Sequence, residues 1–132
     1  MDTKKQTDIA LLLLRLAFGG AMIYGHGWGK LMRLFSDEPI KFFNFMGLGP
    51  EISLGLATFA EVGCALLLML GLFTRWATIP LIITMLVAVF LRHSGDPFGQ
   101  MEKAILYLIT YICLLITGAG WYSLDAQVRN RG

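Results

Sequence analysis

Apolar residues along the chain gather into four long blocks, separated by shorter segments that carry most of the charged residues. The blocks cover residues 9–24, 52–73, 76–91 and 104–121. With flanking glycines and interfacial residues counted in, each block is close to the roughly 17–25 residues with which an α-helix crosses a hydrocarbon layer about 30 Å thick. The pattern predicts four helices, at about residues 9–29, 50–73, 75–92 and 102–121.

Composition supports a membrane location for these helices. Hydrophobic residues make up 56% of the 132-residue chain and charged residues only 15%, whereas a soluble domain has about a quarter of its residues charged. The connection around Thr74 and Arg75 is so short that the second and third helices must form an antiparallel hairpin. We therefore predict an all-α fold, a membrane-embedded antiparallel four-helix bundle, as a single domain over residues 1–132.

The first apolar block also has features of a cleaved signal peptide. Lys4 and Lys5 precede it, and Ala17-Phe18-Gly19 loosely resembles a small-residue cleavage site. Cleavage there would discard Arg15 and leave three spans, so we expect the first helix to be retained. The loop that follows contains IKFFNFMG, residues 40–47, which is either an interfacial segment or an ordinary packed loop.

Charge distribution bears on partners and orientation. The net charge is only +2 and no basic stripe appears, so nucleic acid is not an expected partner. The lysines and arginines outside the apolar blocks divide evenly between the two predicted membrane sides. Because Arg92 and Lys103 lie close to carboxylates and are candidate site residues, we expect a multi-pass cell-membrane protein with both termini in the cytoplasm. The expected partner is the lipid bilayer, and composition leaves an oligomer open.

Two charged residues, Arg15 and Glu61, fall inside apolar blocks. A charge inside a bilayer costs at least a few kcal/mol, so such residues usually face the bundle interior and find partners there. At about 1.5 Å per residue, Arg15 lies roughly 10 Å and Glu61 roughly 16 Å from the same side of the membrane. An arginine side chain can cover this difference, so we predict an Arg15–Glu61 pair in the core. The pair either takes part in chemistry or only fixes helix register.

Polar residues recur at helical spacing on the first and fourth predicted helices. Spacings of three and four place one set on a common face of the first helix: Arg15, Gly19, Met22, His26 and Lys30. A partly polar stripe follows the fourth helix: Glu102, Leu106, Thr110, Cys113 and Thr117. The alternating helix directions bring His26, Lys30, Arg92, His93 and Glu102 to the side opposite the termini. These patterns predict a polar interior pocket that reaches from that side toward the middle of the membrane.

Candidate roles follow from residue chemistry. Glu61, His26 and Glu102 are the candidate catalytic residues, because buried carboxylates and histidines acquire the shifted pKa values that proton transfer needs. Arg15, Lys30 and His93 are candidate substrate-binding residues, although His93 is otherwise explained as an interfacial polar residue.

Metal and thiol chemistry have weaker signals. We predict no metal site, because no two of the histidines and carboxylates show the i, i+4 spacing of a helical site. Both histidines also lie near helix ends, which disfavours an axial haem ligand. Cys64 and Cys113 fall at similar depths on two helices of the same direction. They either form a thiol pair or are small core residues.

Three stretches together resemble the DoxX family of small four-helix membrane proteins. They are LRLAFGGAMIYGHGWGKL at residues 14–31, AEVGCALLLMLGLFTRWA at residues 60–77 and GAGWYSLDA at residues 118–126, and the resemblance extends over about residues 9–126. The family pattern falls on Arg15, His26, Gly27, Lys30, Glu61 and Glu102.

The resemblance implies a redox-associated membrane subunit, because relatives are associated with a terminal quinol oxidase, with thiosulfate-to-quinone electron transfer and with complexes that handle thiol and oxidative stress. A quinone or a small thiol or sulfur compound would enter the pocket. His26, Glu61 and Glu102 would handle protons, Arg15 would keep Glu61 ionised, and Lys30 would hold an anionic or carbonyl group. No flavin, haem or cysteine-cluster motif is present, so a redox partner protein would supply the electron carrier. The alternative is a non-enzymatic assembly partner or a carrier of a small solute or proton.

Overall fold

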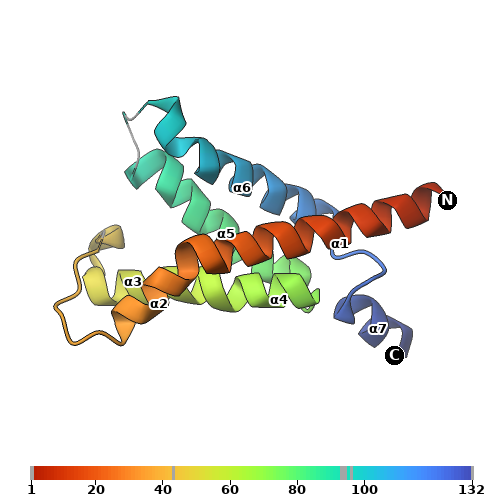
Figure 1. Ribbon diagram of the computed structural model, residues 1–132, viewed down its shortest axis with the longest axis horizontal. Helices are drawn as coiled ribbons and strands as arrows, with labels where there is room; N and C mark the ends of the chain where they lie inside the picture. Colours follow the sequence, from red (N-terminus) through yellow and green to blue (C-terminus); the bar gives the residue numbers. More distant parts are fainter. Residues whose placement is uncertain (1, 43, 93–94, 96, 132) are drawn as a thin grey trace.

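Four helical rods make up the protein, and consecutive rods run in opposite directions (Figure 1). The computed structural model describes residues 2–42, 44–92, 95 and 97–131, and in these residues it contains helices and connecting turns without a β-strand. The first rod consists of α1 (Thr3–Met22), η1 (Ile23–Gly27) and α2 (Trp28–Leu34). The second consists of α3 (Pro50–Thr58), η3 (Phe59–Cys64) and α4 (Ala65–Leu70).

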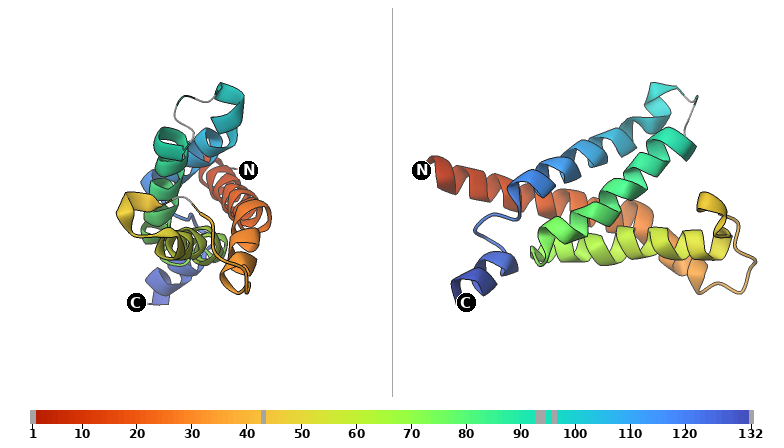
Figure 2. Two further views of the ribbon diagram at one scale, coloured as in Figure 1. Left: turned by 90° about the vertical axis from the view of Figure 1, so that its left-hand side faces the viewer. Right: turned by 180° about the vertical axis from the view of Figure 1, so that it is seen from behind.

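The third and fourth rods form the other half of the bundle. The third is α5 (Thr74–Val87) with η4 (Ala88–Arg92), and the fourth is α6 (Phe98–Thr117). Two short helices, η2 (Phe45–Gly47) and α7 (Leu124–Arg131), precede α3 and follow α6. The views in Figure 2 show α5 and α6 diverging from α3 toward the end that carries the loop before α3.

Length and hydropathy fit a membrane location. Among the described residues, three helical stretches are long and apolar enough to cross a membrane, Thr3–Leu34, Pro50–Leu70 and Thr74–Leu91. A fourth rod of 20 residues is α6. The predicted all-α, membrane-embedded antiparallel four-helix bundle is confirmed. The first helix begins earlier than predicted, because Asp2 caps it by accepting a hydrogen bond of 2.8 Å from the Lys5 N–H.

The core is built from two packed pairs of rods, and α6 of one pair contacts α1 of the other. The first rod packs against α4, and α5 packs along α6. Tyr111 of α6 is fully buried, and its hydroxyl donates to the Phe18 carbonyl of α1 at 3.1 Å. Gly19 lets α1 approach α4, because a Cβ atom there would lie 3.0 Å from the Ala65 carbonyl oxygen.

Arg15 is fully buried where α1 crosses the end of α4. Its Nη1 donates to the carbonyls of Leu68 and Met69 at 3.5 and 3.4 Å, and its Nη2 donates to the carbonyl of Tyr122. The last carbonyls of a helix lack intrahelical donors and carry the negative end of the helix dipole. Arg15 therefore caps α4 and attaches it to the closing segment of the chain.

The predicted pairing of Arg15 with Glu61 is wrong. Arg15 binds backbone carbonyls at the end of α4, while Glu61 pairs with Lys30 of the same rod as Arg15. Similar depths in the membrane do not make two side chains partners. The carbonyls that end α4 are acceptors available to a guanidinium without any carboxylate.

Asp125 makes the second polar link at this end of the bundle. Its carboxylate accepts hydrogen bonds from the backbone N–H groups of Phe73 and Thr74 at 2.8 and 3.0 Å, and its own N–H donates to the Gly71 carbonyl at 2.8 Å. These bonds satisfy donors at the start of α5, where a carboxylate is also favoured by the helix dipole. The closing GAGWYSLDA stretch thus has a structural role.

Candidate functional site

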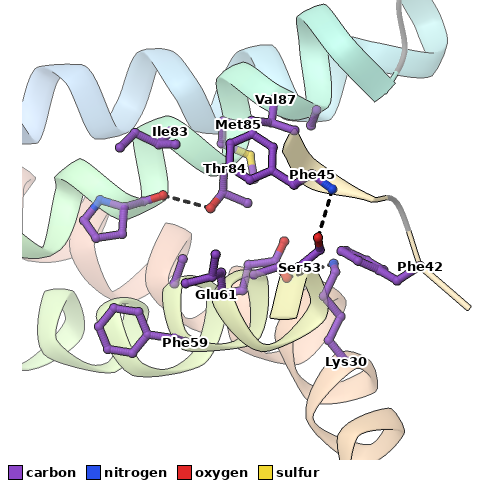
Figure 3. Close-up of a pocket in the computed structure, with 15 residues that line it drawn as sticks. Lys30, Phe42, Phe45, Ser53, Phe59, Glu61, Ile83, Thr84, Met85 and Val87 are labelled. Atoms are coloured by element: carbon purple, nitrogen blue, oxygen red, sulfur yellow. Dashed lines mark hydrogen bonds and ion pairs between the residues drawn. The ribbon is translucent and has the colours of Figure 1, made fainter. Parts of the chain in front are cut away.

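A cavity of about 320 Å³ lies between the second and third rods, at the end of the bundle away from α7 (Figure 3). One wall comes from α3 and η3 and the other from α5 and η4. Phe42 and Phe45 of the loop before α3 contribute aromatic rings, and Lys30 reaches in from α2. Three separate rods and a loop therefore build the site.

Most of the cavity wall is apolar, and the cavity reaches the outer surface of the bundle. Phe59 and Ile83 line it from opposite walls, and both are also exposed, at 59% and 50%. In a membrane-embedded bundle the outer apolar surface faces lipid. A molecule dissolved in the bilayer can therefore reach this cavity sideways, without passing through water.

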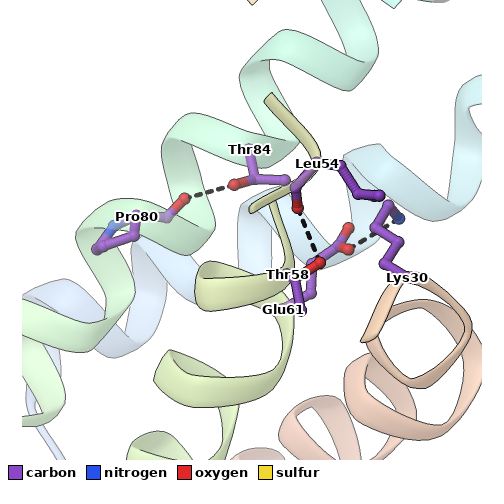
Figure 4. Close-up of polar contacts among 6 residues, drawn as sticks. All are labelled: Lys30, Leu54, Thr58, Glu61, Pro80 and Thr84. Carbon is purple, nitrogen blue, oxygen red and sulfur yellow. Dashed lines mark hydrogen bonds and ion pairs between the residues drawn. The ribbon is translucent and has the colours of Figure 1, made fainter. Parts of the chain in front are cut away.

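The charged groups in the wall are Lys30 and Glu61, which form an ion pair with 2.8 Å between Nζ and Oε2 (Figure 4). Their side chains are only 14% and 4% exposed. Removing two charges from water is costly, and their attraction repays the cost only at close range and good geometry. The pair places one hydrogen-bond donor and one proton acceptor in a mostly apolar wall.

In the part of the chain that the structure describes, three of the four rods contain a π-helical turn: η1 (Ile23–Gly27), η3 (Phe59–Cys64) and η4 (Ala88–Arg92). Glu61 lies in η3, and Lys30 follows η1 by three residues. The first two turns contact each other, and residues of η3 and η4 line the cavity. Such turns are rare, carry one extra residue per turn and often mark functional sites. The irregular backbone of this bundle is thus concentrated around the cavity.

Gly27 sets the distance between the first and second rods at this site. A Cβ atom at Gly27 would lie 2.7 Å from Val62 Cγ2 and 2.8 Å from the Glu61 carbonyl oxygen. The backbone of η1 therefore rests directly on the residue that carries the carboxylate. The neighbouring Gly29 has no atom within 4 Å of the same constructed position.

We expect Gly27→Ala to destabilise the protein and Gly29→Ala to leave it unchanged or stabilise it. Inserting a methyl group into a closely packed contact costs about 1–3 kcal/mol, which outweighs the gain of up to about 1 kcal/mol from replacing a helical glycine by alanine. At Gly29 only that gain applies. Thermal unfolding of both variants in one detergent measures the difference, and equal melting temperatures would contradict this description of the η1–η3 contact.

His26 lies beside the pair in sequence but contacts a different group. Its half-buried ring packs edge-to-face on Tyr107 of α6, with 5.5 Å between centroids. Tyr107 also packs against Phe18 and Tyr111. His26 thus belongs to an aromatic cluster between α1 and α6, and it is not among the residues that line the cavity.

The predicted polar stripe of α6 faces outward. Glu102, Leu106, Cys113 and Thr117 are exposed, whereas the buried face of α6 carries Tyr111 and Leu114. A spacing of three and four places residues on a common face but does not say which way that face points. Hydroxyl groups tolerate the outer surface here because the backbone satisfies them, as Thr110 does by donating to the Leu106 carbonyl at 2.9 Å.

The other predicted site residues are placed as follows. Arg15 lies at the end of α4, away from the cavity, and His93 lies outside the residues that the structure describes. Among the predicted site residues, the structure brings Lys30 and Glu61 together in the cavity wall.

Sequence reasoning missed several residues of the cavity. Ser53 fixes the loop before α3, because its hydroxyl accepts a 2.8 Å hydrogen bond from the Phe45 N–H. Thr84 donates to the carbonyl of Pro80 at 2.8 Å, in a helix that contains this proline in its interior. A proline inside an apolar helix removes a backbone hydrogen-bond donor. The position of Pro80 within the third apolar block was therefore a signal in the sequence for an irregular helix at this wall of the cavity.

The cysteines do not form the thiol pair that was one of the two expectations. Both are free, with Cys64 buried in the core and Cys113 exposed on α6. The alternative of a small core residue therefore holds for Cys64 and not for Cys113. Within the described part of the chain, no three histidine, cysteine or carboxylate side chains gather as metal ligands do.

Comparison with known proteins places this geometry in context. The family model described as DoxX matches residues 10–94, a range that includes Lys30, Glu61 and both walls of the cavity. An uncharacterized protein of Haemophilus influenzae is 32% identical in an alignment 131 residues long, which covers 94% of this chain and 94% of that protein. No solved structure matches the chain significantly.

Proposed function

This chain belongs to the DoxX family of membrane proteins, and on that premise we propose that its cavity binds a lipid-soluble carbonyl compound of the quinone class. The protein would then act as a redox-associated membrane subunit, with electrons supplied by a partner protein. The observation that carries the proposal is the buried Lys30–Glu61 pair in the wall of an apolar cavity that opens on the outer surface of the bundle.

The cavity suits such a ligand in size and polarity. Its volume of about 320 Å³ lies in the range of roughly 300–1,000 Å³ that is typical of small-molecule sites, which are mostly apolar with a few polar groups. The isoprenoid tail of a quinone would extend between Phe59 and Ile83 into lipid. Its ring would lie inside, between the apolar side chains of α3 and α5.

The ion pair offers both groups that quinone reduction requires of a protein. The Lys30 ammonium would donate a hydrogen bond to a ring carbonyl oxygen, and negative charge that develops on that oxygen would strengthen the bond. Reduction to the quinol consumes two electrons, which the partner protein would supply, and two protons, one for each ring oxygen. Glu61 would take up a proton from the aqueous side and pass it to the oxygen that Lys30 contacts, and the second oxygen would receive its proton from water. The proton-transfer roles of His26 and Glu102, and the binding role of His93, stay predictions.

We further propose that four helices cross the cell membrane, with both chain ends on the cytoplasmic side. The start of α1 and the helix α7 lie at the same end of the bundle (Figure 1), as an even number of crossings requires. The cavity then lies nearer the opposite face of the membrane.

Binding of a short-chain quinone by the purified protein in nanodiscs tests the proposal. Decylubiquinone should bind saturably, and decanol, which has a similar tail without the ring, should not compete with it. Lys30→Gln should weaken quinone binding by about tenfold or more, because a hydrogen bond to a charged group contributes about 1.5–3 kcal/mol. Lys41→Gln is the control, since Lys41 is an exposed lysine on the neighbouring loop. Unsaturable partitioning, or equal competition by decanol, would contradict the proposal.

A further inference from the structure

A second pocket, of about 490 Å³, lies at the opposite end of the bundle from the quinone cavity. It is bounded by the start of α1, the start of α5, residues 117–121 and α7. We propose that this terminal pocket binds the phosphodiester headgroup of an anionic phospholipid. The proposal is independent of the quinone cavity, because the two pockets share no residue.

Three cations from three elements line the terminal pocket: Lys4 of α1, Arg75 of α5 and Arg129 of α7. Within the described part of the chain, none of them forms an ion pair. Arg75 donates one hydrogen bond of 3.3 Å to the Ile116 carbonyl, and the Lys4 ammonium lies 5.9 Å from the centroid of the Trp121 ring. A guanidinium has five N–H donors, so Arg75 retains donors for an anion.

The two carboxylates of the pocket are engaged by the backbone. Asp8 accepts a hydrogen bond of 3.1 Å from the Trp121 N–H. Both oxygens of Asp125 accept hydrogen bonds from the start of α5, as described above. The carboxylates thus serve the fold but keep their charge, so the three cations of the lining exceed its two carboxylates by one positive charge.

Thr74 gives a second, independent indication of a missing partner. The residue lines the terminal pocket and is only 1% exposed, and its Oγ1 has no hydrogen-bond partner among the described residues. A buried hydroxyl without a partner is destabilising, and most such groups in proteins are satisfied. A phosphate oxygen would supply the acceptor that this hydroxyl lacks.

The surroundings favour a lipid over a soluble anion. Trp76 and Trp121 line the pocket and are 75% and 49% exposed, and tryptophans concentrate at the level of the lipid headgroups. Phe73, also in the lining, is 61% exposed. A ligand with a phosphodiester and acyl chains would satisfy the cations and cover these apolar side chains together, which a free phosphate cannot do.

Lipid retention tests the proposal on the full chain. Protein is reconstituted in nanodiscs of phosphatidylcholine mixed with phosphatidylglycerol, extracted in mild detergent, and the retained phospholipids are measured by mass spectrometry. The wild type should retain phosphatidylglycerol in preference to phosphatidylcholine. Lys4→Gln and Arg129→Gln should each lower the retained ratio by about fivefold, the factor expected from one basic residue near an anionic headgroup. Lys5→Gln is the matched control, because Lys5 is exposed next to Lys4 and does not line the pocket.

Two further arms separate the source of the anion and the effect on folding. Inorganic phosphate added in excess should leave phosphatidylglycerol in place, and displacement by phosphate would identify a soluble-anion site and overturn the proposal. The melting temperatures of Lys4→Gln and Arg129→Gln in detergent should stay close to that of the wild type, because both side chains are exposed and the described residues show no hydrogen bond or ion pair from either. What Lys4→Gln removes is the exposed contact with the Trp121 ring. Equal retention of the two lipids by the wild type, or an equal loss in Lys5→Gln, would also overturn it.

Discussion

Arg15→Met should destabilise the protein by more than about 3 kcal/mol, because large effects arise where buried polar networks are broken. The side chain is fully buried and donates to three carbonyls, those of Leu68, Met69 and Tyr122. The Leu68 carbonyl would keep the Gly71 N–H as a donor, at 3.1 Å, and each carbonyl that is left without a donor costs about 1–3 kcal/mol. Methionine can fill much of the volume, so the loss would come from the hydrogen bonds rather than from an empty space.

Unfolding by SDS titration in mixed micelles measures this effect. Lys5→Met is the control, because Lys5 is an exposed cation of α1 outside the terminal cap of α4, and surface substitutions of this kind usually change stability by about 0.5 kcal/mol or less. If Arg15→Met unfolded at the same SDS fraction as Lys5→Met, Arg15 would not hold α4 to the closing segment. Normal stability of Arg15→Met would instead favour the predicted role of Arg15 in substrate binding.

Glu61→Leu should destabilise the protein by about 3–5 kcal/mol, the range seen when one partner of a buried ion pair is removed. It leaves the Lys30 ammonium, 14% exposed, in an apolar wall without the carboxylate at 2.8 Å. Combining it with Lys30→Met removes the stranded charge. The double variant should therefore be less destabilised than the sum of the two single variants, with a coupling of about 1–3 kcal/mol, as is usual for residues in direct contact.

The double-mutant cycle is measured under the same SDS conditions. Lys41→Met combined with Glu61→Leu provides the control cycle, because Lys41 is exposed and does not line the cavity. It should show additive effects. Additive effects in the Lys30–Glu61 cycle would mean that the ion pair contributes nothing to the fold as a pair.

The helices were predictable because their cause is local. Four apolar blocks at spanning length lead to four rods, and the short connection at Thr74 leads to a hairpin. The π-helical turns were not predictable, because they depend on how one rod rests on another. Gly27 shows this: its sequence neighbours Gly25 and Gly29 have open space at their Cβ positions, and its contacts with Glu61 and Val62 distinguish it.

The burial of the charged residues was predictable from the sequence, but their partners were not. A charge within an apolar block needs a partner, so Glu61 and Arg15 were correctly expected to be buried. The identity of each partner depends on which acceptors lie nearby in space. Arg15 donates to carbonyls at the end of a helix, and Glu61 forms its ion pair with Lys30 instead. Likewise, helical spacing grouped Glu102 with Cys113 but could not show that their stripe faces outward.

Quinone binding by the Lys30→Met/Glu61→Leu double variant tests most directly whether the ion pair recognises a ligand. The double variant is first shown to be folded by its unfolding transition, and decylubiquinone is then titrated in nanodiscs beside the wild type. We expect at least a tenfold loss of affinity, because about 1.5–3 kcal/mol of hydrogen bonding to a charged group disappears. Wild-type affinity in the folded double variant would contradict the proposal and leave the pair with a structural role alone.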